Sequence, residues 1–332
     1  MPILFSKIMN IQKIALLTSG GDSPGMNACI RSIVRSAISQ KKKVVGIMRG
    51  YEGMIHGEFV ELNARSVSNI LQRGGTILKT ARSKAFMTPE GMKKAYDNLC
   101  REGIEGIIAI GGDGTLKGAV EFNKVNNIPF IGIPGTIDND LFGTDYTIGF
   151  DTALNTIIDA VDKIKDTAAS HDRLFFVEVM GRDSGCLALY SGIASGAEEI
   201  LMPEQKTDIS ALVEKLKESV QRRKTSSVVI VAEGDDGGGA FKIAEAVKKS
   251  FDYDIKVTVL GHIQRGGSPT AKDRIMATRF GAEAVNALLS GQTNKMTGWN
   301  GKEVTLIDLE KVVKQHNPFD KRLVSYNYFL SL

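Results

Sequence analysis

The sequence predicts an α/β fold with mainly parallel sheets, divided into two domains. Short apolar runs rich in isoleucine and valine alternate with segments of helical periodicity from one end of the chain to the other. Several of these runs end directly in glycine or proline, which is typical of buried parallel strands that stop in a turn. The 332 residues are enough for two domains of ordinary size, each with its own core.

The strands are predicted from these apolar runs. The first lies just before Ser19-Gly20-Gly21, and two others lie just before the glycine-rich segment 111–115 and the segment 134–140. A short run in the tail, 303–307, is the last. We expect strands over residues 14–18, 44–47, 104–110, 130–133, 174–179, 199–202, 227–232, 256–260 and 303–307.

The helices are predicted from apolar residues three and four positions apart. Ile30, Ile33 and Val34 begin such a stripe in the first helix. Asp208 is a candidate N-cap, and Gly103 is a stop signal. We expect helices over residues 26–39, 89–101, 116–124, 152–167, 208–221 and 273–289.

Composition excludes several classes of protein. The 42 Lys and Arg against 38 Asp and Glu are too balanced to indicate binding to nucleic acid or to an acidic membrane. No apolar stretch approaches the roughly 18 residues of a membrane span. The three cysteines are far apart, without a CxxC pair, which favours a reducing cytoplasm. The start lacks the features of a signal peptide, so residues 1–8 are either a loose extension or the product of an upstream start codon.

Two loops carry the chemistry. Gly111-Gly112-Asp113-Gly114-Thr115 and 134–140 (PGTIDND) each follow a predicted strand, where open α/β sheets hold their ligands. The glycines let an anion approach backbone N–H groups, and Asp138 and Asp140 place two carboxylates two residues apart. Phosphate-binding backbone beside carboxylates for a metal and a proton is what phosphoryl transfer needs. The residues therefore indicate a small-molecule kinase.

Other motifs are absent or fail on chemistry. The segment 21–25 matches the G-x-S-x-G pattern of a hydrolase, but Pro24 lacks the N–H that the oxyanion hole requires. Walker A, HExxH and a helix-opening GxGxxG do not occur. The acidic run 234–239 is interpreted as a surface loop and not as a metal site, because a flexible run preorganises no ligands.

The motifs LTSGGDSPGMNACIR, IGGDGT, PGTIDND, EVMGR and GHIQRGG, in this order over residues 14–267, resemble the ATP-dependent 6-phosphofructokinases of bacterial type. The resemblance implies two Rossmann-like three-layer domains with the active site in the cleft between them, usually in a cytoplasmic homotetramer. It implies an allosteric glycolytic kinase that transfers the γ-phosphate of MgATP to the 1-hydroxyl of fructose 6-phosphate. The larger, ATP-binding domain would comprise residues 1–149 and 263–313, and the smaller, sugar-binding domain residues 150–262 and 314–332.

The resemblance also assigns catalytic roles. Asp138 would be the general base, and Thr136 would hydrogen-bond the transferring phosphoryl group. Arg82 and Arg182 would neutralise charge on the γ-phosphate. Nucleotide contacts would come from Gly21, Arg82, Ser83, Gly112, Asp113, Gly114 and Thr115. Mg²⁺ would be held by Asp113 and Asp140.

Sugar binding follows from the same resemblance, with Glu233 accepting sugar hydroxyls and His262 and Arg265 near the 6-phosphate. Outside GHIQRGG, His262 would more simply be a core histidine. Arg173 and Lys256 would reach the phosphate from a neighbouring subunit. The family has arginine where Lys256 stands, and lysine keeps the charge but cannot bind the phosphate in a bidentate manner. The full set is Thr136, Ile137, Asp138, Arg173, Met180, Gly181, Arg182, Glu233, Lys256, His262, Ile263, Gln264 and Arg265.

Donor and effector are the remaining expectations. Pyrophosphate-using relatives carry aspartate where Gly114 stands and lysine where Gly135 stands, so ATP is the expected donor. An effector site for ADP or phosphoenolpyruvate is expected. Which effector it prefers is left open, because some of its residues depart from the family pattern, such as Lys165 in place of an arginine. Its residues would be Arg31, Arg35, Lys165, Glu198, Arg222 and Lys224. The alternatives are a pyrophosphate-dependent enzyme and a non-catalytic regulatory subunit on the same fold.

Overall fold

The computed structural model describes residues 11–170, 173–222, 227–317 and 320–330. The chain divides into two compact units, and the chain passes between them more than once. Unit 1 contains residues 1–136, 141–151 and 265–317, and unit 2 contains residues 137–140, 152–264 and 318–332. The expected extension over residues 1–8 and the predicted effector residue Lys224 lie outside the described residues.

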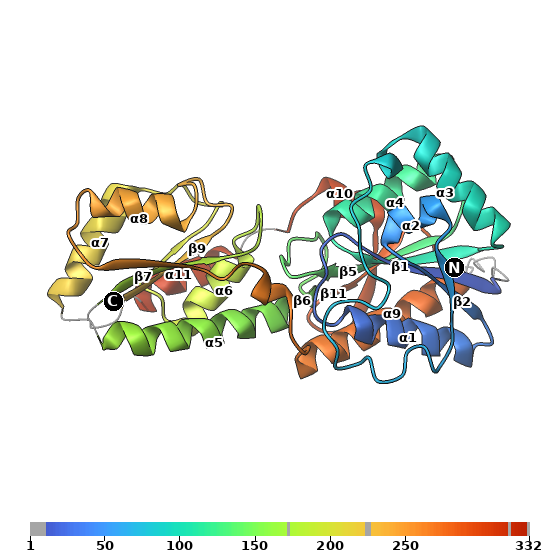
Figure 1. Cartoon of the computed structure of the whole chain (residues 1–332), viewed down its shortest axis with the longest axis horizontal. Helices are drawn as coiled ribbons and strands as arrows, with labels where there is room; N and C mark the ends of the chain where they lie inside the picture. The colour runs from blue at the N-terminus through green and yellow to red at the C-terminus, as the bar shows by residue number, and fades with distance from the viewer. Residues whose placement is uncertain (1–10, 171–172, 223–226, 318–319, 331–332) are drawn as a thin grey trace, which may run out of the picture. The chain divides into compact units, whose positions relative to one another are not determined.

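Unit 1 is built on one large sheet with helices on both faces (Figure 1). Its strands are β1 (Lys13–Ser19), β2 (Lys43–Ile47), β3 (Phe59–Leu62), β4 (Gly106–Gly111), β5 (Phe130–Thr136), β6 (Ile148–Gly149), β11 (Lys295–Trp299) and β12 (Val304–Asp308). Its helices are α1 (Met26–Ser39), α2 (Gly50–His56), η1 (Ala85–Met87), α3 (Pro89–Arg101), α4 (Asp113–Val125), α9 (Ala271–Leu289) and α10 (Leu309–Lys314).

The large sheet is mainly parallel, as the sequence predicts. Its strand order is β12-β11-β5-β4-β1-β2-β3, with β6 paired to the end of β5. Among the described strands of this sheet, the pairs β2–β3 and β11–β12 are antiparallel and the other pairs are parallel. The central β4 is buried along its whole length, which explains its unbroken apolar run.

Alternating residues of β1 serve two cores, one on each face of the sheet. Ile14 and Leu16 pack with α1 and α9, whereas Ala15 and Leu17 pack with α2, α3 and α4. This follows from the two-residue period of a strand, whose successive side chains point to opposite faces. Figure 1 shows α1 and α9 below the sheet, with α2, α3 and α4 above it. The sheet is therefore the middle layer of three.

Unit 2 has a smaller sheet, ordered β10-β7-β9-β8, in which the described strands are all parallel. Helices α7 and α8 cover one face, and α6 with most of α5 covers the other (Figure 1). The strands are β7 (Leu174–Val179), β8 (Glu199–Leu201), β9 (Ser227–Ala232) and β10 (Ile255–Val259). The helices are α5 (Phe150–Ala169), α6 (Cys186–Ser195), α7 (Ile209–Gln221), α8 (Ala240–Lys248), η2 (Gly261–Arg265) and α11 (Lys321–Leu330), of which α5 begins and η2 ends in unit 1.

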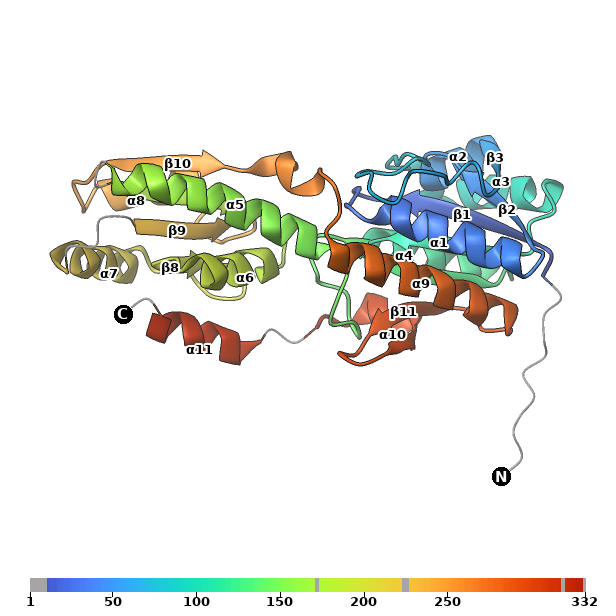
Figure 2. The same cartoon turned by 90° about the horizontal axis from the view of Figure 1, so that it is seen from below.

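Sequence reasoning missed several helices, and α6 shows why. It packs against β8 and β9, and α11 packs against it in turn (Figure 2). A helix covered on more than one side is apolar nearly all round and shows no amphipathic stripe. Helix α2 was missed for another reason: it contains Gly53, which is a weak helix former. A side chain there would clash, because an added Cβ would lie 1.7 Å from the Met48 carbonyl oxygen.

The interpretation of 234–239 as a surface loop is wrong for Asp235. That side chain is buried, and its carboxylate accepts hydrogen bonds from Thr207 Oγ1 at 2.7 Å and from the Gly237 N–H at 2.8 Å. It ties its loop to the segment that precedes α7. Among the described residues, no helix is both long and apolar enough to cross a membrane.

Candidate active site

The loops predicted to bind a nucleotide meet at one edge of the unit 1 sheet. Strands β5, β4 and β1 are neighbours, with Gly111 opposite both Ser19 and Pro134. Because the strands are parallel, the segments that follow them leave the sheet on the same side. The turn 20–25, the segment 112–115 and Thr136 therefore lie at one edge, as the sequence predicts from the ends of the apolar runs.

Small residues let these segments pack closely. A Cβ added at Gly111 would lie 2.3 Å from Thr115 Oγ1, and one added at Gly112 would lie 3.3 Å from the Cβ of Thr136. Thr115 is 2% exposed, and its hydroxyl has no hydrogen-bond partner among the described residues. Buried polar atoms are normally paired, so this hydroxyl is an unmet polar group at the centre of the loops.

Helix α4 begins at Asp113, three residues earlier than the sequence predicts. Gly112 is its N-cap and supplies no side-chain acceptor, and Asp113, Gly114 and Thr115 lie in the first turn of the helix. The first N–H groups of a helix have no partner within it and favour anions. At Gly114, an added Cβ would meet no atom within 4 Å, so this position opens onto free space.

The GHIQRGG segment reaches the glycine turn of unit 1. A Cβ added at Gly21 would lie 1.8 Å from Nη1 of Arg265, so the guanidinium fills the space beside the turn. One added at Gly74 would lie 2.3 Å from the Gly267 carbonyl oxygen. Arg265 Nε is buried and lacks a hydrogen-bond partner among the described residues. Arg265, which the resemblance assigns to the sugar phosphate, thus lies against a predicted nucleotide contact.

The loop that carries Asp138 is held by the start of α6. Ile137 and Asp138 are 2% and 6% exposed. The Ser184 hydroxyl donates to the Asp138 carbonyl oxygen at 3.0 Å and accepts from the Cys186 N–H at 3.3 Å. Sequence reasoning missed Ser184, whose only signal is its position two residues after Arg182. The carboxylate proposed as base is therefore carried by a fixed, buried backbone.

Several of the predicted sugar contacts lie at the carboxyl ends of neighbouring strands of unit 2. Segment 180–182 follows β7, Glu233 follows β9, and η2 follows β10. The Arg182 N–H donates to Glu233 Oε1 at 2.8 Å, and the Met180 N–H donates to Gln264 Oε1 at 3.1 Å. Gln264 is fully buried, and its amide Nε2 donates to the Gly261 carbonyl at 2.9 Å. Gln264 thus braces the ends of β7 and η2.

Two features of this edge bear on ligand binding. Arg182 has a left-handed backbone, with φ of 52°, and its side chain is exposed. Such a conformation is uncommon outside glycine and is often found at functional sites. His262 is exposed and Ile263 is 58% exposed, so His262 is not the core histidine that it would be outside this motif.

Arg173 and Lys256 lie at the opposite, amino ends of β7 and β10. Both contact the same carboxylate: Arg173 Nε donates to Asp254 Oδ2 at 2.7 Å, and Lys256 Nζ lies 2.7 Å from Oδ1. Hydrogen bonds from Lys256 and Arg173 hold the pKa of Asp254 below its usual value. Sequence reasoning missed Asp254, because its ion pair with Arg173 depends on the register between β10 and β7. That register sets Lys256 opposite Phe175 and so brings Asp254 beside Arg173.

The proposed metal ligands belong to different units: Asp113 lies in unit 1 and Asp140 in unit 2. Asp113 is paired with Lys117 one turn along α4, at 2.7 Å, and its side chain is 34% exposed. Asp140 is half-buried. Among the described residues, no three His, Cys, Asp or Glu side chains form a group that could hold a metal ion. Two carboxylates suit Mg²⁺, which is usually held by one or two carboxylates together with water and substrate phosphates.

The described effector candidates of unit 2 lie around the carboxyl end of α6. Lys165 Nζ donates to the carbonyls of Ser195 and Gly196, the latter at 3.0 Å. Glu198 is buried and accepts a hydrogen bond at 2.9 Å from Ser219, which lies on α7. Arg222 is the residue directly after that helix. Arg31 and Arg35 lie on α1 in unit 1.

Comparison with known proteins gives a consistent result. A sequence profile of the family "Phosphofructokinase" matches residues 13–288. The chain belongs to the phosphofructokinase family. It is 54% identical over 323 residues to the "ATP-dependent 6-phosphofructokinase 2" of Bacteroides thetaiotaomicron, covering 97% of this chain and 99% of that one. It is 53% identical over 322 residues to the "ATP-dependent 6-phosphofructokinase 1" of Thermus thermophilus, covering 97% of this chain and all of that one.

Solved structures support the family fold. The phosphofructokinase of Saccharomyces cerevisiae is 37% identical, with a TM-score of 0.85 over 96% of this chain, which spans 47% of the yeast chain. A pyrophosphate-dependent phosphofructokinase from Marinobacter aquaeolei gives a TM-score of 0.84 at 22% identity over 94% of this chain and 86% of that chain, and shows the fold alone. The predicted fold class, two α/β units with mainly parallel sheets, is confirmed.

Proposed function

We propose that the protein transfers the γ-phosphate of ATP to the 1-hydroxyl of fructose 6-phosphate, giving fructose 1,6-bisphosphate and ADP, in the cytoplasm. The observation that carries the proposal is the meeting of the turn 20–25, the segment 112–115 and Thr136 at the ends of three neighbouring parallel strands. The names of relatives about half identical over nearly the whole chain support ATP and the sugar phosphate as the substrates. Residues 1–149 and 263–313 would bind the nucleotide, and residues 150–262 and 314–332 the sugar.

Asp138 would take the proton of the 1-hydroxyl as that oxygen attacks phosphorus. A base must be held within hydrogen-bond reach of its proton, and the hydrogen bond from Ser184 supports this by fixing the Asp138 backbone. Thr136 would donate to an oxygen of the transferring group. Arg82 and Arg182, both exposed, would neutralise charge that builds on that group.

The nucleotide phosphates would lie against the first turn of α4, with Asp113 and Asp140 offering carboxylate oxygens to a Mg²⁺ ion. When bound, Mg²⁺ would screen the phosphate charge and orient the γ-phosphate. Because Asp113 is paired with Lys117, binding would require that pair to open or to share the carboxylate.

The sugar would be bound by residues from two chains. Glu233, His262 and Arg265 would come from one chain, and Arg173 and Lys256 from a neighbour in a homotetramer. An effector site for ADP or phosphoenolpyruvate would include Arg31 and Arg35 together with the group at the end of α6. The described members of that group are Lys165, Glu198 and Arg222, and the resemblance adds Lys224, which lies outside the described residues.

The test is turnover of fructose 6-phosphate by the purified protein, with MgATP and with pyrophosphate in parallel. The proposal expects turnover with ATP alone. Asp138→Asn should lower kcat by about 10²- to 10⁴-fold while leaving sugar binding, measured by calorimetry, within about twofold. Turnover with pyrophosphate alone would overturn the choice of donor, and silence with both donors would overturn the enzyme proposal.

A further inference from the structure

The last two residues of β5 extend beyond its two longer neighbours. Among the described strands, β4 pairs with β5 as far as Pro134, and β11 pairs with it as far as Gly132. The two-residue strand β6 pairs with the residues that remain, Gly135 and Thr136. Strand β6 therefore holds the part of β5 that carries Thr136, the expected contact of the transferring phosphoryl group.

Thr147, directly before β6, adds a side-chain contact at the same point. Its Oγ1 donates to the Thr136 carbonyl oxygen at 2.7 Å. Thr147 is fully buried, so water does not readily replace its hydroxyl. The carbonyl belongs to the planar peptide bond between Thr136 and Ile137, and fixing it restricts rotation of the backbone at Thr136. The Thr147 hydroxyl thus constrains the backbone from which the Thr136 side chain projects.

The segment that contains Thr147 is itself fixed by a buried carboxylate in the first turn of α9. Asp273 Oδ1 accepts hydrogen bonds from the Gly149 N–H and from the Tyr146 hydroxyl, each at 2.7 Å. The Asp273 N–H donates in turn to Oγ1 of Thr270, the N-cap of α9, at 3.2 Å. Hydrogen bonds to a carboxylate are among the stronger ones in proteins. Thr147 therefore lies between two residues that are anchored to α9.

Strand β6 also packs closely against the glycine turn 20–25. A Cβ added at Gly149 would lie 2.6 Å from the Cβ of Ser23, and one added at Gly25 would lie 2.6 Å from Cγ2 of Ile148. Contacts this close leave no room for a larger side chain at either glycine. Because β6 has so little space in which to shift, the neighbouring Thr147 is a donor with a fixed position.

We propose that Thr147 is a positioning residue for Thr136. By holding the Thr136 carbonyl, it keeps the Thr136 hydroxyl directed at the transferring phosphoryl group. This rests on the proposed function, in which Thr136 donates to that group. A donor aimed in advance at the charge that develops during transfer lowers the barrier more than it strengthens substrate binding. The effect therefore falls on kcat and not on either KM.

The experiment makes the same substitution at two buried threonines of one sheet. Thr147→Val removes the hydroxyl and keeps the shape of the side chain, so kcat should fall about tenfold, with the KM for MgATP and for fructose 6-phosphate within about twofold. Thr297→Val is the matched control, because Thr297 on β11 is equally buried and its hydroxyl has no hydrogen-bond partner among the described residues. Its kcat should stay within about twofold of wild type.

A second pair of variants makes the comparison without valine. Thr147→Ser keeps a donor at the same place and should recover most of the activity that Thr147→Ala loses. A merely structural role would not produce this difference in kcat at unchanged KM. A Thr147→Ser enzyme as slow as Thr147→Ala would overturn the proposal.

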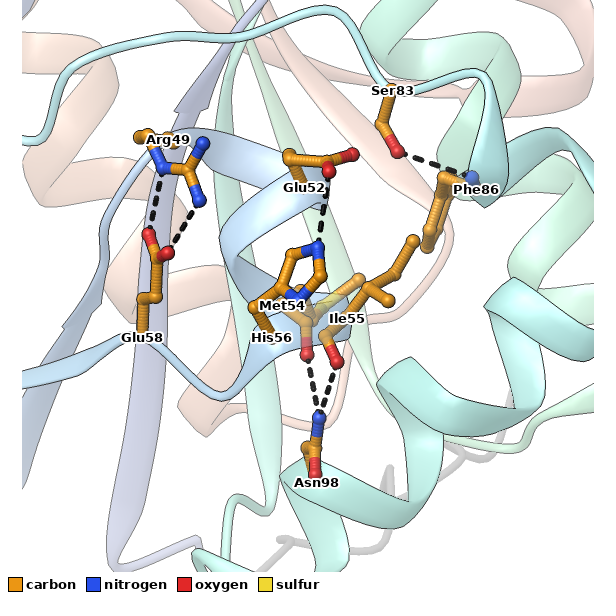
Figure 3. Close-up of polar contacts among 9 residues, drawn as sticks. All are labelled: Arg49, Glu52, Met54, Ile55, His56, Glu58, Ser83, Phe86 and Asn98. Carbon is orange, nitrogen blue, oxygen red and sulfur yellow. Dashed lines mark hydrogen bonds and ion pairs between the residues drawn. The ribbon is translucent and has the colours of Figure 1, made fainter.

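Another control separates positioning from a general loss of stability. Asn98, a buried residue of α3, donates through Nδ2 to the carbonyls of Met54 and Ile55 at 3.1 and 2.8 Å, at the end of α2 (Figure 3). Asn98→Ala removes both bonds, so it should lower the urea midpoint at least as much as Thr147→Val. Because neither carbonyl belongs to the proposed site, its kcat should stay within about twofold of wild type.

A double-mutant cycle tests whether Thr147 acts through Thr136. Thr136→Val removes the proposed donor, so adding Thr147→Val should lower kcat by no more than a further factor of about two. Additive losses would overturn the proposal, as would an unchanged kcat in Thr147→Val or an equal loss of kcat in Asn98→Ala. A wild type inactive with ATP refutes the proposed function, whereas an active wild type with an unaffected Thr147→Val refutes this inference alone.

Discussion

Replacing Ser184 by alanine tests whether α6 holds the proposed base in place. The substitution removes the 3.0 Å hydrogen bond to the Asp138 carbonyl and the 3.3 Å bond from the Cys186 N–H. Ser184 and Asp138 are 7% and 6% exposed, so water does not readily replace the lost hydroxyl. Removing a hydrogen bond from a buried group costs about 1–3 kcal/mol. The loop should relieve that cost by shifting, which moves the carboxylate.

The expected result is a loss of kcat of about tenfold, since 1.36 kcal/mol in the barrier corresponds to a factor of ten. The assay is the initial rate at saturating MgATP and fructose 6-phosphate. Ser191→Ala is the matched control, because Ser191 is also a buried serine but lies within α6 and donates to carbonyls of its own helix. A Ser184→Ala enzyme with kcat within about twofold of Ser191→Ala would refute the reasoning.

Three further changes test other parts of the structure. Asp254→Asn should free Arg173 and Lys256 and lower the KM for fructose 6-phosphate; an unchanged or raised KM would contradict this. Because the pKa of Asp254 is lowered in the folded protein, its ion pairs stabilise the fold at pH values above the ordinary carboxyl pKa. That stabilisation is lost as the pH falls through the lowered pKa. In the variant, the thermal-unfolding midpoint should therefore fall less steeply with decreasing pH in the acid range. Gly114→Asp, at a position open to free space, should raise the KM for MgATP about tenfold, and the neutral Gly114→Asn should raise it much less. Asp273→Ala leaves two buried donors, a tyrosine hydroxyl and a backbone N–H, without their acceptor and should lower stability by about 2–6 kcal/mol, measured by urea unfolding; an unshifted midpoint would contradict it.

Sequence reasoning succeeded where one local signal determines the structure. Strand ends marked by glycine or proline predicted that Gly112 and Thr136 would lie at the same edge, because parallel neighbours require it. It failed where a position depends on partners that are distant along the chain. The pairing of Asp254 with Arg173 depends on strand register, which the sequence around either residue does not reveal. The buried Gln264 lies within a recognised motif, but only the fold shows that it braces a strand end.

The positions of two groups of predicted sugar ligands in unit 2 support a sugar site formed by two chains. One group follows the carboxyl ends of the strands, whereas Arg173 and Lys256 lie at the amino ends of β7 and β10. The six residues of β7 separate these ends by about 17 Å at 3.3 Å per residue, which exceeds the length of a hexose phosphate. If both groups bind one sugar phosphate, as proposed, a second chain would supply one of them, because a single unit 2 holds the two groups at opposite ends of its strands.

Mixed assemblies test this directly. Asp138→Asn and Arg173→Ala subunits should each be nearly inactive alone. Unfolded together and refolded as a mixture, they should regain activity, because sites with the intact base of one chain and the intact arginine of another make up about a quarter of the total under random assembly. Separately refolded samples mixed just before the assay are the control. If the co-refolded mixture stays as inactive as its parents, both groups of ligands do not serve one site across a subunit boundary, and Arg173 needs another role.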